Sequence, residues 1–154
     1  MELIAAAGKG PLAVDTAIFI YWIEEHPRWV TLLDELFRAA DSGKLALVTS
    51  AVTLLEVLVV PYRAGDIFLA ERYEALLTRG RGLRLVDLDR AQLRAAAQLR
   101  AVRPALKTPD ALQVAAALAA GCTALLTNDR DIPSVAGLRI LQLASFDPVR
   151  PGRT

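Results

Sequence analysis

The chain has one cysteine and one histidine among its 154 residues. The single cysteine, Cys122, excludes an internal disulfide and a zinc site built on several thiolates. It also fits a reducing compartment, so we expect a cytoplasmic protein. The single histidine, His26, precedes Pro27 without a nucleophile motif beside it, and we interpret it as a surface residue. Ser50 lacks a Gly-rich elbow and no Gly-rich phosphate loop is present, which disfavours triad and P-loop chemistry.

A long uninterrupted apolar run is also lacking. The most apolar stretch, 111–126, contains Gln113, Gly121 and Thr123, and it is shorter than the roughly 20 residues that a membrane span needs. At the N-terminus, Glu2 stands where a secretory signal would have a positive start before a long apolar region. We therefore expect neither a membrane segment nor export.

Neither sign of charge predominates, because the formal net charge is only +1. A nucleic-acid binder often has a strongly basic balance or a basic stripe, so the overall charge does not identify one. Basic side chains do gather locally in two groups: Arg79, Arg81 and Arg84, then Arg94, Arg100, Arg103 and Lys107. These groups are equally compatible with a phosphate-binding groove and with solvated helix faces.

Apolar residues, in contrast, are abundant: 54% of the chain is hydrophobic and 23% is charged. A chain of this length buries roughly two-thirds of its unfolded surface in one core, so we predict one domain over 1–154, with its core at about 11–147. We see no internal repeat and no linker. The first ten or so residues and the Pro-containing tail at 148–154 are expected to be loose ends.

Five short apolar runs predict strands. They are mostly non-alternating, which is typical of strands buried on both faces of a parallel sheet. The segment 29–40 has an apolar stripe at helical spacing, and 109–120 is apolar nearly all round, opening with Thr108 and ending at Gly121. Strands alternating with helices predict a three-layer α/β/α sandwich with a five-stranded parallel sheet. The predicted strands are 12–15, 45–49, 83–86, 124–127 and 138–143.

Four acidic residues fall near the expected carboxyl edge of this sheet, where ligands bind in open α/β folds. Asp15 ends the first predicted strand and Asp129 follows the fourth. Asp110 lies in the first turn of the predicted buried helix. Glu56 lies in the apolar stretch 53–60, where an unpaired carboxylate is costly to bury.

Each acid also has an ordinary structural interpretation. Asp15 could cap a helix, Asp110 could complement a helix dipole, and Asp129 could form an Asx turn. Glu56 could complete a capping box with Thr53, although Ser50 is the better cap candidate. These alternatives stay open for each residue taken alone.

The four acids together favour a metal site. Two carboxylates about 4 Å apart repel by roughly 4 kcal/mol at an effective dielectric near 20, so four gathered together call for a cation. Oxygen ligands without a cysteine cluster favour Mg²⁺ or Mn²⁺ over zinc. Such an ion activates water and stabilises charge on an attacked phosphate. The predicted reaction is therefore phosphodiester hydrolysis.

Four motifs resemble the PIN-domain nucleases, and within them the VapC-type toxins of toxin–antitoxin pairs. The motifs are Val14-Asp15-Thr16, Thr49-Ser50 followed by Glu56, Thr108-Pro109-Asp110-Ala111-Leu112-Gln113, and Thr127-Asn128-Asp129-Arg130-Asp131.

The resemblance implies a metal-dependent endoribonuclease with a five-stranded parallel sheet, RNA as its substrate, an antitoxin partner and a homodimeric state. The implied metal and catalytic set is Asp15, Glu56, Asp110 and Asp129, with Thr16, Thr127 and Asp131 in support.

Two positions depart from the family pattern. Ala17 replaces a second polar residue after the first Asp-Thr pair, and Ile132 stands where an aromatic is common. Ala17 also disfavours an aspartyl-nucleophile phosphatase. An RNA-processing nuclease that is not a toxin, and an inactive protein-binding module, remain alternatives. Trp22 and Trp29 are interpreted as core or dimer packing.

Overall fold

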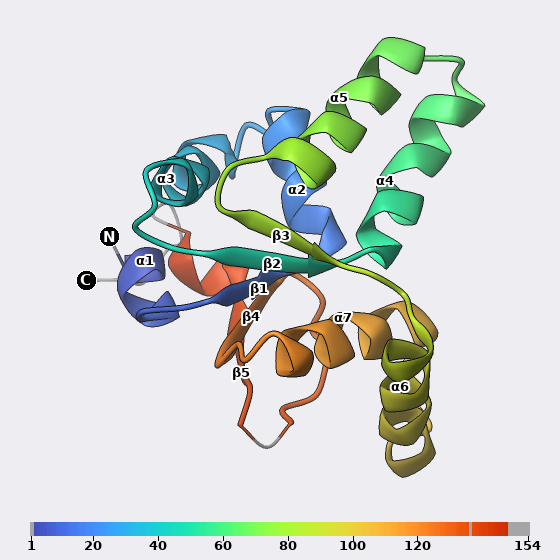
Figure 1. The fold of residues 1–154 in the computed structure, drawn as a ribbon. Helices are drawn as coiled ribbons and strands as arrows, with labels where there is room; N and C mark the ends of the chain where they lie inside the picture. Colours follow the sequence, from blue (N-terminus) through green and yellow to red (C-terminus); the bar gives the residue numbers. More distant parts are fainter. Residues whose placement is uncertain (1, 136, 148–154) are drawn as a thin grey trace.

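A parallel sheet of five strands runs through the centre of the computed structural model, which describes residues 2–135 and 137–147 (Figure 1). The strand order is β3-β2-β1-β4-β5, and every neighbouring pair is parallel. This confirms the predicted sheet. The strands are β1 (Leu12–Val14), β2 (Leu47–Ser50), β3 (Leu83–Val86), β4 (Ala124–Thr127) and β5 (Arg139–Gln142).

Helices cover both faces of the sheet and confirm the α/β sandwich (Figure 1). The predicted helices at 29–40 and 109–120 correspond to α3 and α7. Within the described ranges, no helix has both the length and the apolarity to cross a membrane. The helices are α1 (Glu2–Ala7), α2 (Thr16–Ile23), α3 (Val30–Asp41), α4 (Val52–Arg63), α5 (Ile67–Arg79), α6 (Arg90–Val102), α7 (Thr108–Ala119) and the 3-10 helix η1 (Leu143–Phe146).

Two expectations about segment ends need correction. The first ten residues are not a loose end, because α1 buries Leu3 and Ala7, four residues apart on one helix face, in the main core. The second strand starts at Leu47, two residues later than predicted, since the Leu45 N–H donates to the Ala39 carbonyl at the end of α3. The predicted loose tail at 148–154 lies outside the described residues.

The continuous apolar character of the strands serves two cores, one on each face of the sheet. Successive strand residues point to opposite faces. Leu12 and Val14 therefore pack with α1–α5, whereas Ala13 packs with α7 in the second core. In β4, Leu125 likewise faces α7 while Leu126 faces the first core. Burial on both faces leaves no solvated side on β1, β2 and β4, as the sequence predicted, whereas the edge strands β3 and β5 are partly exposed at Arg84 and Arg139.

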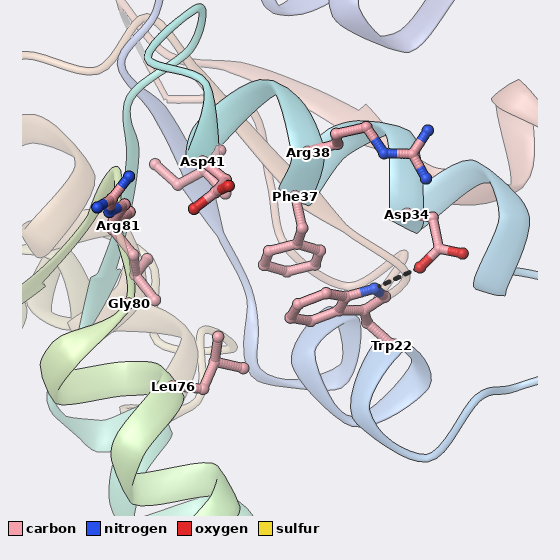
Figure 2. Close-up of a pocket in the computed structure, with 10 residues that line it drawn as sticks. Trp22, Asp34, Phe37, Arg38, Asp41, Leu76, Gly80 and Arg81 are labelled. Atoms are coloured by element: carbon pink, nitrogen blue, oxygen red, sulfur yellow. Dashed lines mark hydrogen bonds between the residues drawn. The ribbon is translucent and has the colours of Figure 1, made fainter.

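The two tryptophans pack inside the fold, as core packing predicts. Trp29 is buried in the main core. Trp22 stacks on Phe37 with ring centroids 4.0 Å apart, and its indole N–H donates to Asp34 over 2.8 Å (Figure 2). His26 is half-buried and contacts the Tyr21 ring edge at a centroid distance of 5.1 Å.

Gly82 joins α5 to β3 at a position that no larger residue fits. Its φ is +70°, and an added Cβ would lie 2.3 Å from the Ala40 carbonyl oxygen. We expect Gly82→Ala to lower the free energy of unfolding by about 2 kcal/mol, measured by urea denaturation.

Gly43→Ala is the matched control, because Gly43 has φ +79° with nothing within 4 Å of the added Cβ. Gly43→Ala should lower the free energy of unfolding by only about 1 kcal/mol, the cost of a left-handed backbone at a residue with a Cβ. Equal losses in the two variants would show that the close approach to Ala40 carries no energy.

Candidate active site

The candidate site lies where the strand order reverses. From β1 the chain builds β2 and β3 on one side, and then returns to build β4 and β5 on the other. Asp15 directly follows β1, and Asp129 follows β4, the neighbour that pairs with β1. Both carboxylates therefore lie at the carboxyl edge of the sheet, the usual place for a ligand in such folds.

The four predicted acidic residues line one open hollow of about 470 Å³. Asp110 comes from the first turn of α7 and Glu56 from α4, and both helices begin at this edge of the sheet. The lining consists of Asp15, Thr16, Ala17, Ile20, Tyr21, Glu56, Asp110, Asn128 and Asp129. The fold thus brings residues from four separate segments of the chain to one place.

Asp15 is held from two sides. Its Oδ1 accepts the Thr16 backbone N–H at 2.8 Å and its Oδ2 accepts the Thr127 hydroxyl at 2.7 Å. Burial raises the pKa of Asp15, the two donors oppose that rise, and the Asp129 charge adds to it. Burial therefore outweighs both hydrogen bonds, and no lysine or arginine in the lining of the hollow offsets it.

Glu56 is anchored by Thr16, whose hydroxyl donates to Glu56 Oε1 at 2.7 Å. The capping-box interpretation is wrong, because Thr53 lies inside α4 and bonds to other partners. The N-cap of α4 is Ala51, which has no side-chain cap, and Ser50 Oγ just before it accepts the Val52 N–H at 3.2 Å. The carboxylate of Glu56 is therefore placed by the start of α2 rather than by its own helix.

Asp110 carries the clearest electrostatic signal. Burial raises its pKa most, followed by the charges of Asp129 and Asp15, a hydrogen bond with Asp129 and the charge of Glu56, and together they bring it to about 6. All three other acids of the site therefore act on Asp110. A half-buried carboxyl surrounded by like charges keeps its proton to a higher pH than a free one does.

Asp129 and Asp131 form the turn after β4. The Asp131 N–H donates to Asp129 Oδ1 at 2.8 Å, and the Asp129 N–H donates to Thr127 Oγ1 at 3.0 Å. Asp131 itself is exposed and does not line the hollow. Its supporting role thus goes no further here than its backbone contact with Asp129.

Three of the acids have an ordinary structural role and also line the hollow. They are Asp15, Asp110 and Asp129. Asp15 is the N-cap of α2, Asp110 lies in the first turn of α7, and Asp129 accepts the Asx-turn hydrogen bond. Each role uses one carboxylate oxygen or the local dipole. The two interpretations are therefore compatible for these three residues.

Comparison with known proteins identifies the family. Residues 12–138 match the PIN domain, which is most of the chain and includes all four acids. The chain belongs to the PIN domain family. No curated protein sequence matches it.

Solved structures share this fold at low sequence identity. VapBC2 from Rickettsia felis, bound to a DNA fragment from its promoter, aligns with a TM-score of 0.64 and 17% identity over 85% of this chain and 97% of that one. The DNA-bound VapBC from Salmonella typhimurium aligns with a TM-score of 0.58 and 24% identity over 86% and 97%. A toxin–antitoxin complex from Klebsiella pneumoniae gives 0.60 and 20% over 82% and 94%.

Beneath the carboxylates, this PIN domain has a buried polar cluster that sequence reasoning did not assign. Gln113 is 2% exposed, and Thr49 and Thr53 are at most 1% exposed. Gln113 Nε2 donates to Thr53 Oγ1 at 2.7 Å. The available signal was a glutamine within the otherwise apolar run 111–117, because a buried amide needs hydrogen-bonding partners.

The two basic groups, for which the sequence left a groove and solvated faces equally open, do not lie at this hollow. Neither arginine cluster contributes to its lining. Arg100 instead donates to the Leu106 carbonyl and the Thr108 hydroxyl, each at 2.9 Å. A different hollow, of about 410 Å³, lies beside the starts of β2 and β3 at the opposite edge of the sheet, with Trp22 and Phe37 in its wall (Figure 2).

The donor set of this PIN domain suits a hard divalent cation, because four carboxylates line the hollow and its other side-chain donors are oxygen-bearing Thr, Tyr and Asn. As the side chains stand, no group of three or more His, Cys, Asp or Glu in residues 2–135 and 137–147 is arranged to hold an ion. Binding would therefore require side-chain movement, which the hydrogen bonds on Asp15 and Glu56 leave mainly to Asp110 and Asp129.

Proposed function

We propose that this PIN domain is a divalent-metal-dependent endoribonuclease that hydrolyses RNA phosphodiester bonds. Asp15, Glu56, Asp110 and Asp129 would hold Mg²⁺ or Mn²⁺. The observation that carries the proposal is the meeting of all four carboxylates at one hollow whose lining contains no lysine or arginine. A site with this excess of negative charge gains most from a small doubly charged ion.

The chain's own residues prepare the carboxylates for this role. Thr127 and the Thr16 amide each occupy one oxygen of Asp15, and the Thr16 hydroxyl occupies Oε1 of Glu56. These contacts restrict the rotation of both acids before any ligand binds, which is the preorganisation a metal site needs. When bound, the ion supplies an activated water and stabilises charge on the phosphate.

The lining also explains why a cation is required for an anionic substrate. No lysine or arginine belongs to the lining of the hollow. An RNA phosphate would meet only carboxylates and neutral groups there, and like charges repel. Neutralisation by a metal therefore precedes any productive approach of the substrate.

The proposal extends to a toxin with an antitoxin partner. Its support is the shared fold with the VapBC and toxin–antitoxin complexes together with exposed apolar side chains on the α4–α5 hairpin. Several large apolar side chains exposed on one hairpin are typical of a protein-binding site, for an antitoxin or a second copy in a cytoplasmic homodimer. The side chains are Leu55, Val59, Val60, Tyr62, Ile67 and Phe68.

Incubation of the purified protein with mixed RNA tests the activity. Fragments should accumulate in Mn²⁺ or Mg²⁺ and disappear when EDTA is added, because the carboxylates alone cannot neutralise the phosphate. Intact RNA in every condition would instead favour the protein-binding module. Cleavage that persists in EDTA would remove the metal from the proposal.

A further inference from the structure

We propose that Gln113 is a positioning residue of this site, which keeps the single hydroxyl proton of Thr16 on the Glu56 carboxylate. The inference rests on the proposed metal-dependent function and adds a residue to it. Gln113 lies one turn after Asp110 on α7, and its side chain reaches the end of β2 and the starts of α2 and α4.

The orientation of the Gln113 amide is fixed by the backbone. The Ser50 N–H can only donate, and it lies 3.2 Å from Gln113 Oε1. The oxygen of the amide must therefore face β2, and its NH₂ group must face the threonines. Nε2 then donates to Thr53 Oγ1 at 2.7 Å and to Thr16 Oγ1 at 3.3 Å.

The remaining hydroxyl protons follow from this orientation. Thr49 is 2.8 Å from the Val14 carbonyl, which can only accept, so Thr49 donates there rather than along its longer 3.4 Å contact with Gln113 Oε1. In the Thr49–Thr53 pair, at 2.8 Å, Thr53 must then be the donor. Each threonine has one proton, so the proton of Thr53 is already used.

Thr16 is the point where this cluster meets the site. Its Oγ1 lies 3.2 Å from Thr53 Oγ1 and 2.7 Å from Glu56 Oε1. With Thr53 supplied by Gln113, the Thr16 proton is free to go to Glu56. Without Gln113, Thr53 becomes a buried acceptor with no donor except Thr16, and such an acceptor is costly to leave unpaired.

The test is the affinity for Mn²⁺ alone, measured by isothermal titration calorimetry. Gln113→Met keeps the length of the side chain and removes both N–H donors of the amide. We expect it to weaken Mn²⁺ binding by about 10- to 100-fold, the usual effect of losing a group that orients a metal ligand. Circular dichroism reports whether each variant is folded.

A second substitution separates positioning from packing. In Gln113→Met with Thr53→Val, nothing competes for the Thr16 proton, so binding should return to within about 3-fold of the wild type. A cavity or packing defect would not be relieved in this way. The double variant also replaces both polar partners, so it keeps the test open if Gln113→Met alone does not fold.

Gln92→Met is the matched control, because Gln92 is 6% exposed and donates to the Ala115 carbonyl on the neighbouring helix, away from the hollow. It should bind Mn²⁺ like the wild type. Unchanged binding by folded Gln113→Met, or a double variant that stays weak, overturns the role of Gln113. A wild-type protein that binds no Mn²⁺ overturns the proposed function itself.

Discussion

Replacing Asp15 with asparagine is expected to lower Mn²⁺-dependent RNA cleavage by about 10²- to 10³-fold while the protein remains folded. The substitution removes the charge of the most restrained carboxylate of the site. It preserves the N-cap of α2, because an asparagine oxygen accepts the Thr16 N–H as well as an aspartate oxygen does. Initial rates on a defined RNA and the circular dichroism spectrum measure the two effects separately.

Asp89→Asn provides a control of the same chemistry. Asp89 caps α6 by accepting the Gln92 N–H at 2.9 Å, and it does not line the hollow. This variant should cleave RNA at the wild-type rate. If Asp15→Asn stays active, Asp15 is no part of the reaction; if both variants lose activity alike, the loss reflects helix capping.

The metal-free protein should become more stable when Asp110 is replaced with asparagine. Asp110 has a pKa of about 6 in the fold, against an ordinary value of 3.8 for an aspartate. The native state therefore holds this proton where the unfolded state has lost it, so stability falls as pH rises from about 4 through 6. Because solvent screens this half-buried group, we expect Asp110→Asn to raise the free energy of unfolding at pH 7.5 by about 1 kcal/mol, which raises the Tm by roughly 2–4 °C.

Two comparisons check the origin of that gain. At pH 4 or below, the Tm difference between Asp110→Asn and the wild type should shrink toward zero, since both residues are then neutral. Mn²⁺ at 100 times its Kd should stabilise the wild type by about 2.7 kcal/mol, and this gain should largely vanish in the variant. A variant that is less stable than the wild type at pH 7.5 without metal would contradict the repulsion.

The sheet and the placement of Asp15 and Asp129 could be predicted because they depend on local patterns. A short apolar run with an acid at or just after its end marks a buried strand and its carboxyl end, and parallel pairing brings such ends together. The first turn of α7 was equally readable from Thr108 and Pro109. The motifs that resemble PIN domains point to the same residues.

Other features depend on contacts that no local pattern contains. The helix at residues 2–7 is too short to be stable alone, and it exists because Leu3 packs in the main core. The partners of Gln113 come from β2, α2 and α4, so its orientation could not be read from the sequence of α7. The arginine groups were ambiguous for the same reason.

Helix α7 links the interior of the domain to its chemistry. It is buried without a break over residues 111–117, with Asp110 one residue before that run and Gln113 inside it. The buried packing of α7 therefore holds Asp110 and Gln113 in place at the hollow, whereas a surface loop would move independently of the core. Partial melting of α7 would therefore move both groups away from the hollow, and substitutions that enlarge Ala115, Ala116 or Ala117 would shift them along with the packing.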